Sequence, residues 1–216
     1  MGNRISRQLE QKMKPVEDQI LQDRVNRIGQ KIASVSDRKD LVYFFKVLDL
    51  DPVNATALPG GYVYINRGLL EKVKNDDDEL ACVIAHEIGH IAARHQVKRL
   101  QAGLGFSLLQ ALAIGAQVDP RAIHGANIAA TQLFLAYSRN DELQADRLGA
   151  RYAKRAGYTP EAMIRFLEKL EKLSQDKPAP RSYLKTHPYV SDRIRVVREE
   201  IEGKMAFEDY INRQEE

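Results

Sequence analysis

Two histidines and a glutamate form the pattern with the clearest chemical meaning, the HExxH motif His86-Glu87-Ile88-Gly89-His90. Residues four apart lie on one face of a helix, so both imidazoles can reach one metal ion, with Glu87 beside them. Neutral imidazoles together with an oxygen ligand suit Zn²⁺. A motif this short also occurs by chance, as two solvated histidines beside a surface glutamate, so its surroundings must decide between the two interpretations.

A second, acidic segment offers the missing oxygen ligand. Glu142 and Asp146 are four residues apart and share a face of the helix that the sequence predicts from about Arg139. Two histidines leave a tetrahedral zinc site incomplete, so Glu142 can be the third ligand and Asp146 can orient a ligand histidine. Taken alone, the acidic cluster would be a solvated helix start; beside an HExxH motif we favour ligation.

Two more blocks stand out, NATALPGG (54–61) and THP (186–188) followed by Arg193. Together with HEIGH (86–90) and SRNDELQAD (138–146), they resemble one family of gluzincin metallopeptidases, that of the CAAX prenyl endopeptidase, HtpX, Oma and the periplasmic β-barrel assembly-enhancing protease. The similarity runs from about Val25 to Ile201. Thr56 departs from the family pattern, which often has Phe there.

The resemblance implies a zinc endopeptidase with one Zn²⁺ per chain and a polypeptide substrate. The zinc ligands would be His86, His90 and Glu142, and Glu87 would be the general base. Asn54 and Ala55 would lie on an edge strand above the site, where an extended substrate backbone pairs with the strand. Backbone pairing is indifferent to most side chains, so we expect extended or misfolded polypeptides as substrates, in envelope protein quality control.

His187 and Arg193 have open roles within the resemblance. His187 of the His-Pro block would lie near the metal, where it could steady the oxyanion or occupy the open zinc position and hold the enzyme latent. Arg193 could bind a substrate carbonyl or the reaction intermediate, or form an ordinary salt bridge.

Two other functions compete with proteolysis. The chain could be a latent or non-catalytic zinc protein with a chaperone-like or adaptor role, its site closed by His187. It could also be a membrane-associated interaction module, because Gly103–Val118 is apolar and rich in Gly and Ala, although too short for a transmembrane span. Peripheral membrane contact through residues 103–118 is therefore a possible partner interaction.

The elements that must position these residues give an α+β fold, mostly helical and zincin-like, with a small sheet of about three strands over the active-site helix. Strands are predicted within Leu41–Leu50 and as a hairpin, Val53–Leu58 and Tyr62–Asn66, around Pro59-Gly60-Gly61. Helices are predicted over the first ~36 residues, with a kink at Pro15, and from Asp76 to about Leu100. Further helices should begin after Ser138 and Thr159 and at Ser191.

Two residues near the motif are expected to have no role in the chemistry. His95 follows His90 by five residues, so on a continuous helix it points away from the His86/His90 face and packs on the surface. Cys82 is expected to be a small buried core residue.

Composition bounds the remaining possibilities. The 216 residues include 33 Lys+Arg and 30 Asp+Glu, for a net charge of +3, and no basic run suggests nucleic acid. We expect a single metallopeptidase domain, with an N-terminal helical segment (1–36), a catalytic core (37–203) and a polar tail (204–216). The polar N-terminus has no signal-like apolar segment, so the location is cytoplasmic or, as the resemblance implies, the bacterial envelope or periplasm after removal of a signal.

Overall fold

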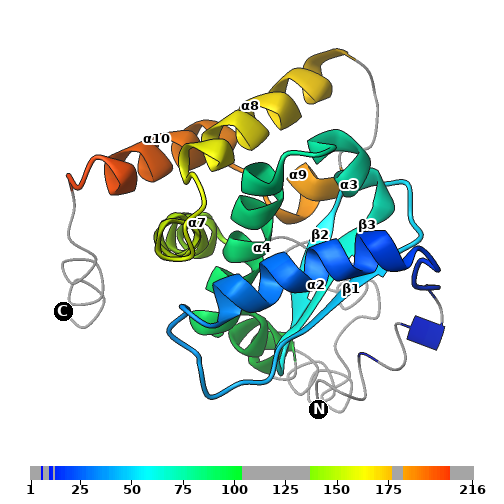
Figure 1. Ribbon diagram of the computed structural model, residues 1–216. Helices are drawn as coiled ribbons and strands as arrows, with labels where there is room; N and C mark the ends of the chain where they lie inside the picture. Colours follow the sequence, from blue (N-terminus) through cyan, green and yellow to red (C-terminus); the bar gives the residue numbers. More distant parts are fainter. Residues whose placement is uncertain (1–5, 7–9, 12, 104–136, 177–181, 205–216) are drawn as a thin grey trace, which may run out of the picture.

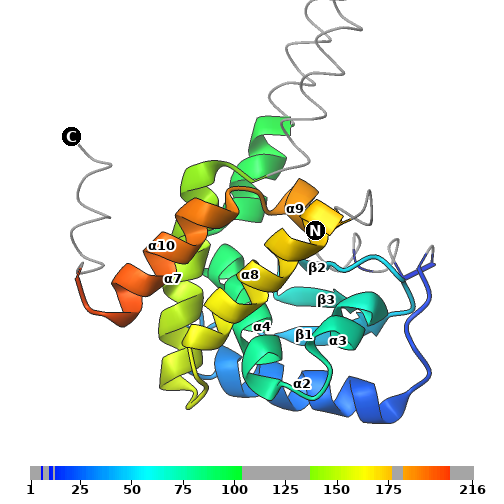
Figure 2. The same ribbon diagram turned by 90° about the horizontal axis from the view of Figure 1, so that it is seen from above.

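The computed structural model describes residues 6, 10–11, 13–103, 137–176 and 182–204. It shows an α+β fold dominated by helices, with one three-stranded sheet in the described part. Figures 1 and 2 show helix α4 in the middle of the molecule, with the sheet on one side and helices α7 and α10 on the other. The predicted fold class is confirmed. The described elements, in chain order, are α2 (Gln19–Ala33), β1 (Phe44–Leu48), β2 (Ala55–Leu58), β3 (Tyr62–Asn66), α3 (Arg67–Val73), α4 (Asp77–Ala92), α7 (Arg139–Arg155), α8 (Glu161–Asp176), α9 (Ser182–Thr186) and α10 (Val190–Ile201).

The sheet has the order β1-β3-β2, so β2 forms one of its edges in the described part of the chain. β2 and β3 are antiparallel, with Ala55 opposite Ile65, whereas β1 and β3 are parallel. The predicted hairpin is confirmed. Its turn uses Gly60 and Gly61 at φ 91° and 90°, a backbone conformation that side chains with a Cβ rarely adopt.

Helix α2 packs across β1 and α4 with its apolar face, which includes Val25, Ile28 and Ile32. Asp18 caps it by accepting a hydrogen bond from Leu21 N. The prediction of helix before this point is wrong for residues 13–18, which are not helical. The chain there pairs with β1 instead: Pro15 and Leu48 form an isolated antiparallel bridge, and proline lacks the N–H that a helix interior needs.

Helix α4 is the core of the fold. Asp76 caps it through Glu79 N, and every residue from Glu79 to Ile91 is buried. The prediction that this helix runs to about Leu100 is wrong. It ends at Ala92 because Arg94 adopts a left-handed conformation with φ 57°, and a new helical segment, 95–103, follows in a different direction.

Helix α7 lies directly against α4 because each helix has a glycine at the contact. A Cβ on Gly89 would be 2.7 Å from the carbonyl oxygen of Ala145, and one on Gly149 would be 2.9 Å from the backbone nitrogen of His86. The predicted capping box is present: Ser138 and Asp141 exchange hydrogen bonds with each other's backbone N–H. This helix therefore begins at a fixed residue and passes close to the HExxH helix.

The C-terminal helices place the His-Pro block. α9 ends at Thr186, immediately before His187 and Pro188. The predicted cap at Ser191 is wrong, because α10 already begins at Val190, after Tyr189 in the left-handed region at φ 68°. The chain thus makes a sharp turn at residues 187–189 between α9 and α10.

No helix in the described ranges combines the length and apolarity needed to cross a membrane. Of the segment 103–118, for which membrane contact is hypothesised, only Gly103 belongs to the residues that the structure describes. The sequence also predicts a helix over residues 123–137, and this segment likewise lies outside the described residues, apart from Tyr137.

Candidate active site

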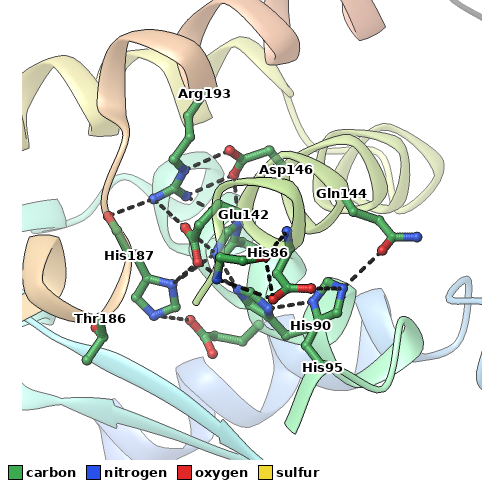
Figure 3. Close-up of polar contacts among 12 residues, drawn as sticks. His86, His90, His95, Glu142, Gln144, Asp146, Thr186, His187 and Arg193 are labelled. Carbon is green, nitrogen blue, oxygen red and sulfur yellow. Dashed lines mark hydrogen bonds and ion pairs between the residues drawn. The ribbon is translucent and has the colours of Figure 1, made fainter. Parts of the chain in front are cut away.

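Four side chains from three parts of the fold converge between α4 and α7. His86 and His90 come from α4, Glu142 from α7 and His187 from the turn after α9, as Figure 3 shows. Their potential ligand atoms all lie within 4.8 Å of one another, and all four residues are buried. Among the described residues, this is the group of His, Cys, Asp or Glu that could hold a metal ion.

The spacing of these atoms fits tetrahedral metal coordination. His86 Nε2 lies 3.0 Å from His90 Nε2, and His90 Nε2 lies 3.3 Å from Glu142 Oε1. His187 Nδ1 is 3.3 Å from His86 Nε2 and 3.0 Å from Glu142 Oε1. Zinc–ligand bonds of about 2.0–2.1 Å imply ligand–ligand distances of roughly 3.3 Å. The predicted ligands are therefore brought together, with His187 at the fourth corner.

The charge states of two ligands also suit a metal, which needs neutral imidazoles and ionised carboxylates. Burial lowers the pKa of His90 well below its usual value, so its ring is neutral. Burial raises the pKa of Glu142, but the charges of His187 and Arg193 outweigh this and hold it well below its usual range. A neutral imidazole and a carboxylate thus face each other without bulk water.

Glu87 is the one buried acid at this site without a hydrogen-bonded oxygen. It is fully buried, and neither carboxylate oxygen accepts a hydrogen bond from the described residues. Its closest polar contact is His187 Nε2, 3.4 Å from Oε1, which is a charge contact without hydrogen-bond geometry. Because an unsatisfied buried carboxylate costs free energy, its retention points to a functional role.

His86 is oriented from behind by a buried ion pair. Its Nδ1 lies 2.7 Å from Asp146 Oδ1. Arg193 binds the same carboxylate with two nitrogens, Nε to Oδ2 at 2.7 Å and Nη2 to Oδ1 at 2.9 Å. Burial raises the pKa of Asp146, yet Arg193 and His86 outweigh it and lower the pKa. Asp146 therefore stays ionised and accepts the Nδ1 proton of His86.

Arg193 contacts four site residues, one of which is His86, whose Nδ1 lies 3.3 Å from Nη2. Besides Asp146, its Nη1 lies 3.0 Å from Glu142 Oε2 and donates to the carbonyl oxygen of His187 at 3.3 Å. Its side chain is 1% exposed, and all three guanidinium nitrogens contact protein groups. Sequence reasoning considered substrate binding or a salt bridge for this residue; the contacts that the structure shows are those of an ion pair.

His187 is held between the site and the sheet. Its ring stacks on Tyr183 with centroids 4.5 Å apart, and the preceding Thr186 donates to the side-chain oxygen of Asn54 at 3.4 Å. Burial lowers the pKa of His187, but the carboxylates of Glu142 and Glu87 outweigh this and raise it. The His-Pro turn thus connects the metal ligands to the chain that leads into β2.

Asn54 and Ala55 lie where β2 begins. Asn54 accepts a hydrogen bond from Asn66 N through its backbone carbonyl, and Ala55 is paired with Ile65 in the ladder. The side chain of Ala55 is buried, so anything that this residue offers to a ligand comes from its backbone. Ala55 thus lies on the edge strand and Asn54 directly precedes it, and pairing of these residues with a substrate stays a prediction.

Sequence reasoning missed the surroundings of His90. The prediction that His95 packs on the helix surface is wrong: it is fully buried, and its Nδ1 lies 2.8 Å from His90 Nδ1. The error follows from the break at Arg94, which redirects the chain. Tyr137 stacks on His90 with ring centroids 3.8 Å apart, and no motif in the sequence indicates that contact. Cys82 is a buried core residue, as predicted.

Comparison with known proteins agrees with this geometry. The chain is 29% identical over 204 residues to the β-barrel assembly-enhancing protease of Escherichia coli K12, covering 90% of this chain but 42% of that protein. It is 34% identical over 186 residues to the mitochondrial metalloendopeptidase OMA1 of Arabidopsis thaliana, covering 84% of this chain and 37% of that one. With the metalloprotease LoiP of E. coli K12, identity is 27% over 158 residues, 72% of this chain and 61% of the other.

The chain therefore spans less than half the length of the first two relatives. The sequence also matches the profile of peptidase family M48 over residues 19–201, from the start of α2 to the end of α10. Since this match includes every residue of the buried cluster, the chain belongs to peptidase family M48.

Proposed function

We propose that this chain is a zinc-dependent endopeptidase domain that hydrolyses extended or misfolded polypeptides. The observation that carries the proposal is the fully buried Glu87, whose two oxygens accept no hydrogen bond from the described residues, beside four converging metal-ligand atoms. A purely structural metal site needs no such carboxylate, whereas a hydrolase needs a base.

The metal would be held by His86, His90 and Glu142, one Zn²⁺ per chain. When bound, zinc supplies a Lewis acid and lowers the pKa of water from 15.7 to about 7. Asp146 keeps a proton on Nδ1 of His86, so that the lone pair on Nε2 of His86 faces the site. Arg193 positions Asp146 and Glu142 by neutralising both, and we assign it a positioning role.

Glu87 would move the proton that the reaction requires. Its carboxylate takes a proton from the attacking water and gives it to the amine nitrogen of the departing peptide. The buried surroundings favour this transfer, because no protein hydrogen bond has to be broken before the carboxylate accepts the proton.

The substrate would be an extended polypeptide that pairs with β2. This strand is an edge of the sheet in the described part of the chain, and Asn54 and Ala55 lie at its start, next to the His-Pro turn. Strand addition uses the backbone of the substrate, which every polypeptide has. Unfolded segments expose that backbone and folded proteins do not, which supports quality control as the setting.

The relatives support a location and a domain organisation as proposals. One is named for the assembly of β-barrels and another for mitochondria, so we propose a bacterial envelope location for this chain. We propose further that residues 37–203 form the catalytic core of a single metallopeptidase domain, preceded by the segment 1–36, in which α2 is the described helix, and followed by the tail 204–216. The family match over residues 19–201 supports a single domain, and it includes α2.

Casein hydrolysis by the zinc-loaded protein, compared with Glu87→Gln, tests the proposal. Glutamine keeps the shape of the side chain and leaves the three ligands in place but cannot take up a proton. We expect cleavage by the wild type and a loss of at least 100-fold in the variant at equal zinc content. Equal cleavage by both proteins would indicate a contaminating protease, and no cleavage by either, with zinc bound, would contradict the proposal.

A further inference from the structure

The two histidine ligands are supported in different ways. His86 directs its Nδ1 to the carboxylate of Asp146, whereas His90 directs its Nδ1 to another imidazole, that of His95, at 2.8 Å. His95 in turn directs its Nε2 to the side-chain oxygen of Gln144 at 3.0 Å, as Figure 3 shows. Asp141 Oδ1 lies 3.2 Å from the same nitrogen.

These contacts fix the position of every proton in the chain of rings once His90 uses Nε2 as a ligand atom. A neutral imidazole has one N–H, so His90 must then carry its proton on Nδ1 and donate it to His95. His95 must accept at Nδ1 and therefore carries its own proton on Nε2. That proton is donated to Gln144, whose side-chain oxygen can only accept.

The fold holds His95 in place for this contact. The left-handed Arg94 ends α4 and turns the chain, so that His95 lies against His90 instead of continuing around the helix. The His95 side chain is fully buried, and Tyr137 covers the face of the His90 ring. In the described part of the chain, His95 Nδ1 is thus the polar atom that His90 Nδ1 contacts.

We propose that His95 is a positioning residue that sets the tautomer and orientation of His90 and thereby raises the zinc affinity of the site. The proposal rests on the zinc site proposed above. Loss of such a partner behind a ligand histidine typically weakens metal binding 10- to 100-fold. The effect should be confined to metal binding, because His95 makes its hydrogen bonds to side chains and not to the backbone.

Three substitutions test the accepting nitrogen of His95, Nδ1, separately from its donating nitrogen, Nε2. His95→Asn places a carbonyl oxygen near the position of Nδ1 and can still accept from His90. His95→Gln reaches the position of Nε2 and keeps the donor toward Gln144 but not the acceptor. His95→Leu keeps neither. We expect the zinc Kd, measured by chelator competition, to stay within about threefold of wild type for Asn and to rise 10- to 100-fold for Gln and Leu.

The order of the variants in zinc affinity tests the proposal. The proposal is overturned, and His95 is a packing residue, in either of two cases. In the first, the His95→Asn variant binds zinc as weakly as His95→Leu. In the second, the His95→Leu variant binds zinc as tightly as the wild type. Thermal unfolding of the metal-free variants identifies any that are misfolded, and the comparison of Asn with Gln remains informative because both are smaller polar side chains.

A spectroscopic measurement tests the tautomers without activity. Long-range ¹H–¹⁵N spectra of the zinc-loaded protein should show His95 with a non-protonated Nδ1 and a protonated Nε2. The opposite tautomer would overturn the proposal. Failure of the zinc site itself gives a separate result: the wild type, like a Glu142→Ala control, would then show no tight zinc binding at all.

Discussion

At the scale of residues, the site is a balance of buried charges. Glu142 and Asp146 are carboxylates in the protein interior, and the guanidinium of Arg193 contacts both. Removing one member of such a group leaves a buried charge unpaired, which typically costs about 3–5 kcal/mol. Glu87 differs from the other two acids, because among the described residues it contacts a histidine, His187, and not Arg193. The contacts of His187 therefore decide how accessible the base is.

We predict that His187→Ala raises the rate of casein cleavage. The His187 ring lies between Glu142, 3.0 Å from Nδ1, and Glu87, 3.4 Å from Nε2, so it fills the space that a substrate must enter. Steady-state rates at equal zinc content measure the effect. His187→Asn is a matched control that keeps a polar group near the position of Nδ1. Its cleavage rate should lie between those of the wild type and His187→Ala. A decrease in the alanine variant would instead indicate that His187 assists the reaction.

At the scale of elements, the contact between α4 and α7 determines whether the ligands meet. His86 and His90 belong to one helix, and Glu142 and Asp146 to the other. Gly89 and Gly149 allow the two backbones to approach, since a side chain at either position would overlap the opposite helix. The distances between the metal ligands therefore depend on two glycines, which have no side chain and offer no ligand atom themselves.

Gly149→Ala should separate the helices. Its Cβ would lie 2.9–3.0 Å from backbone atoms of His86, which cannot move aside as a side chain can. We expect the free energy of unfolding to fall by about 1–3 kcal/mol, in the range of overpacked cores, together with weaker zinc binding. Denaturant unfolding and chelator competition measure both. Gly103→Ala is the control: it is helical, a Cβ there would meet nothing within 4 Å, and stability should be unchanged or slightly higher.

The sequence predicts those parts of the site that depend on local spacing and capping. The HExxH pattern identifies His86 and His90, and the Ser138–Asp141 capping box sets the phase of the helix that carries Glu142. Prediction fails where a residue other than glycine takes a left-handed conformation, as Arg94 does before His95 and Tyr189 does before α10. Tertiary packing imposes these conformations, and no local preference of Arg or Tyr indicates them.

At the scale of the whole molecule, the described hydrophobic core contains none of the candidate metal ligands. Its buried hydrophobic residues form one cluster that extends from α2 through the sheet and α4 to α8 and α10. The four candidate metal ligands come from α4, α7 and the turn between α9 and α10. Zinc should therefore add to the stability of a fold that already exists.

Removal of zinc with a chelator should lower the Tm and leave the helical content unchanged. A ligand present at 1,000 times its Kd stabilises the folded state by about 4.1 kcal/mol, which corresponds to a shift of roughly 10 °C for a protein of this size. Differential scanning calorimetry with parallel far-ultraviolet circular dichroism measures both quantities. Loss of the helical signal on chelation would show that the metal is needed for folding, and Glu142→Ala should show little response to zinc.

The contacts of Arg193 have a consequence for the synthesis of the protein. The ligands on α4 and α7 are made first, but the guanidinium that neutralises Asp146 and Glu142 belongs to α10, the last described helix. Until α10 has been made and has folded back, Glu142 and Asp146, which lie four residues apart on α7, lack the positive charge that offsets the cost of burying them. We therefore expect α7 to reach its final buried position against α4 only after Arg193 is in place.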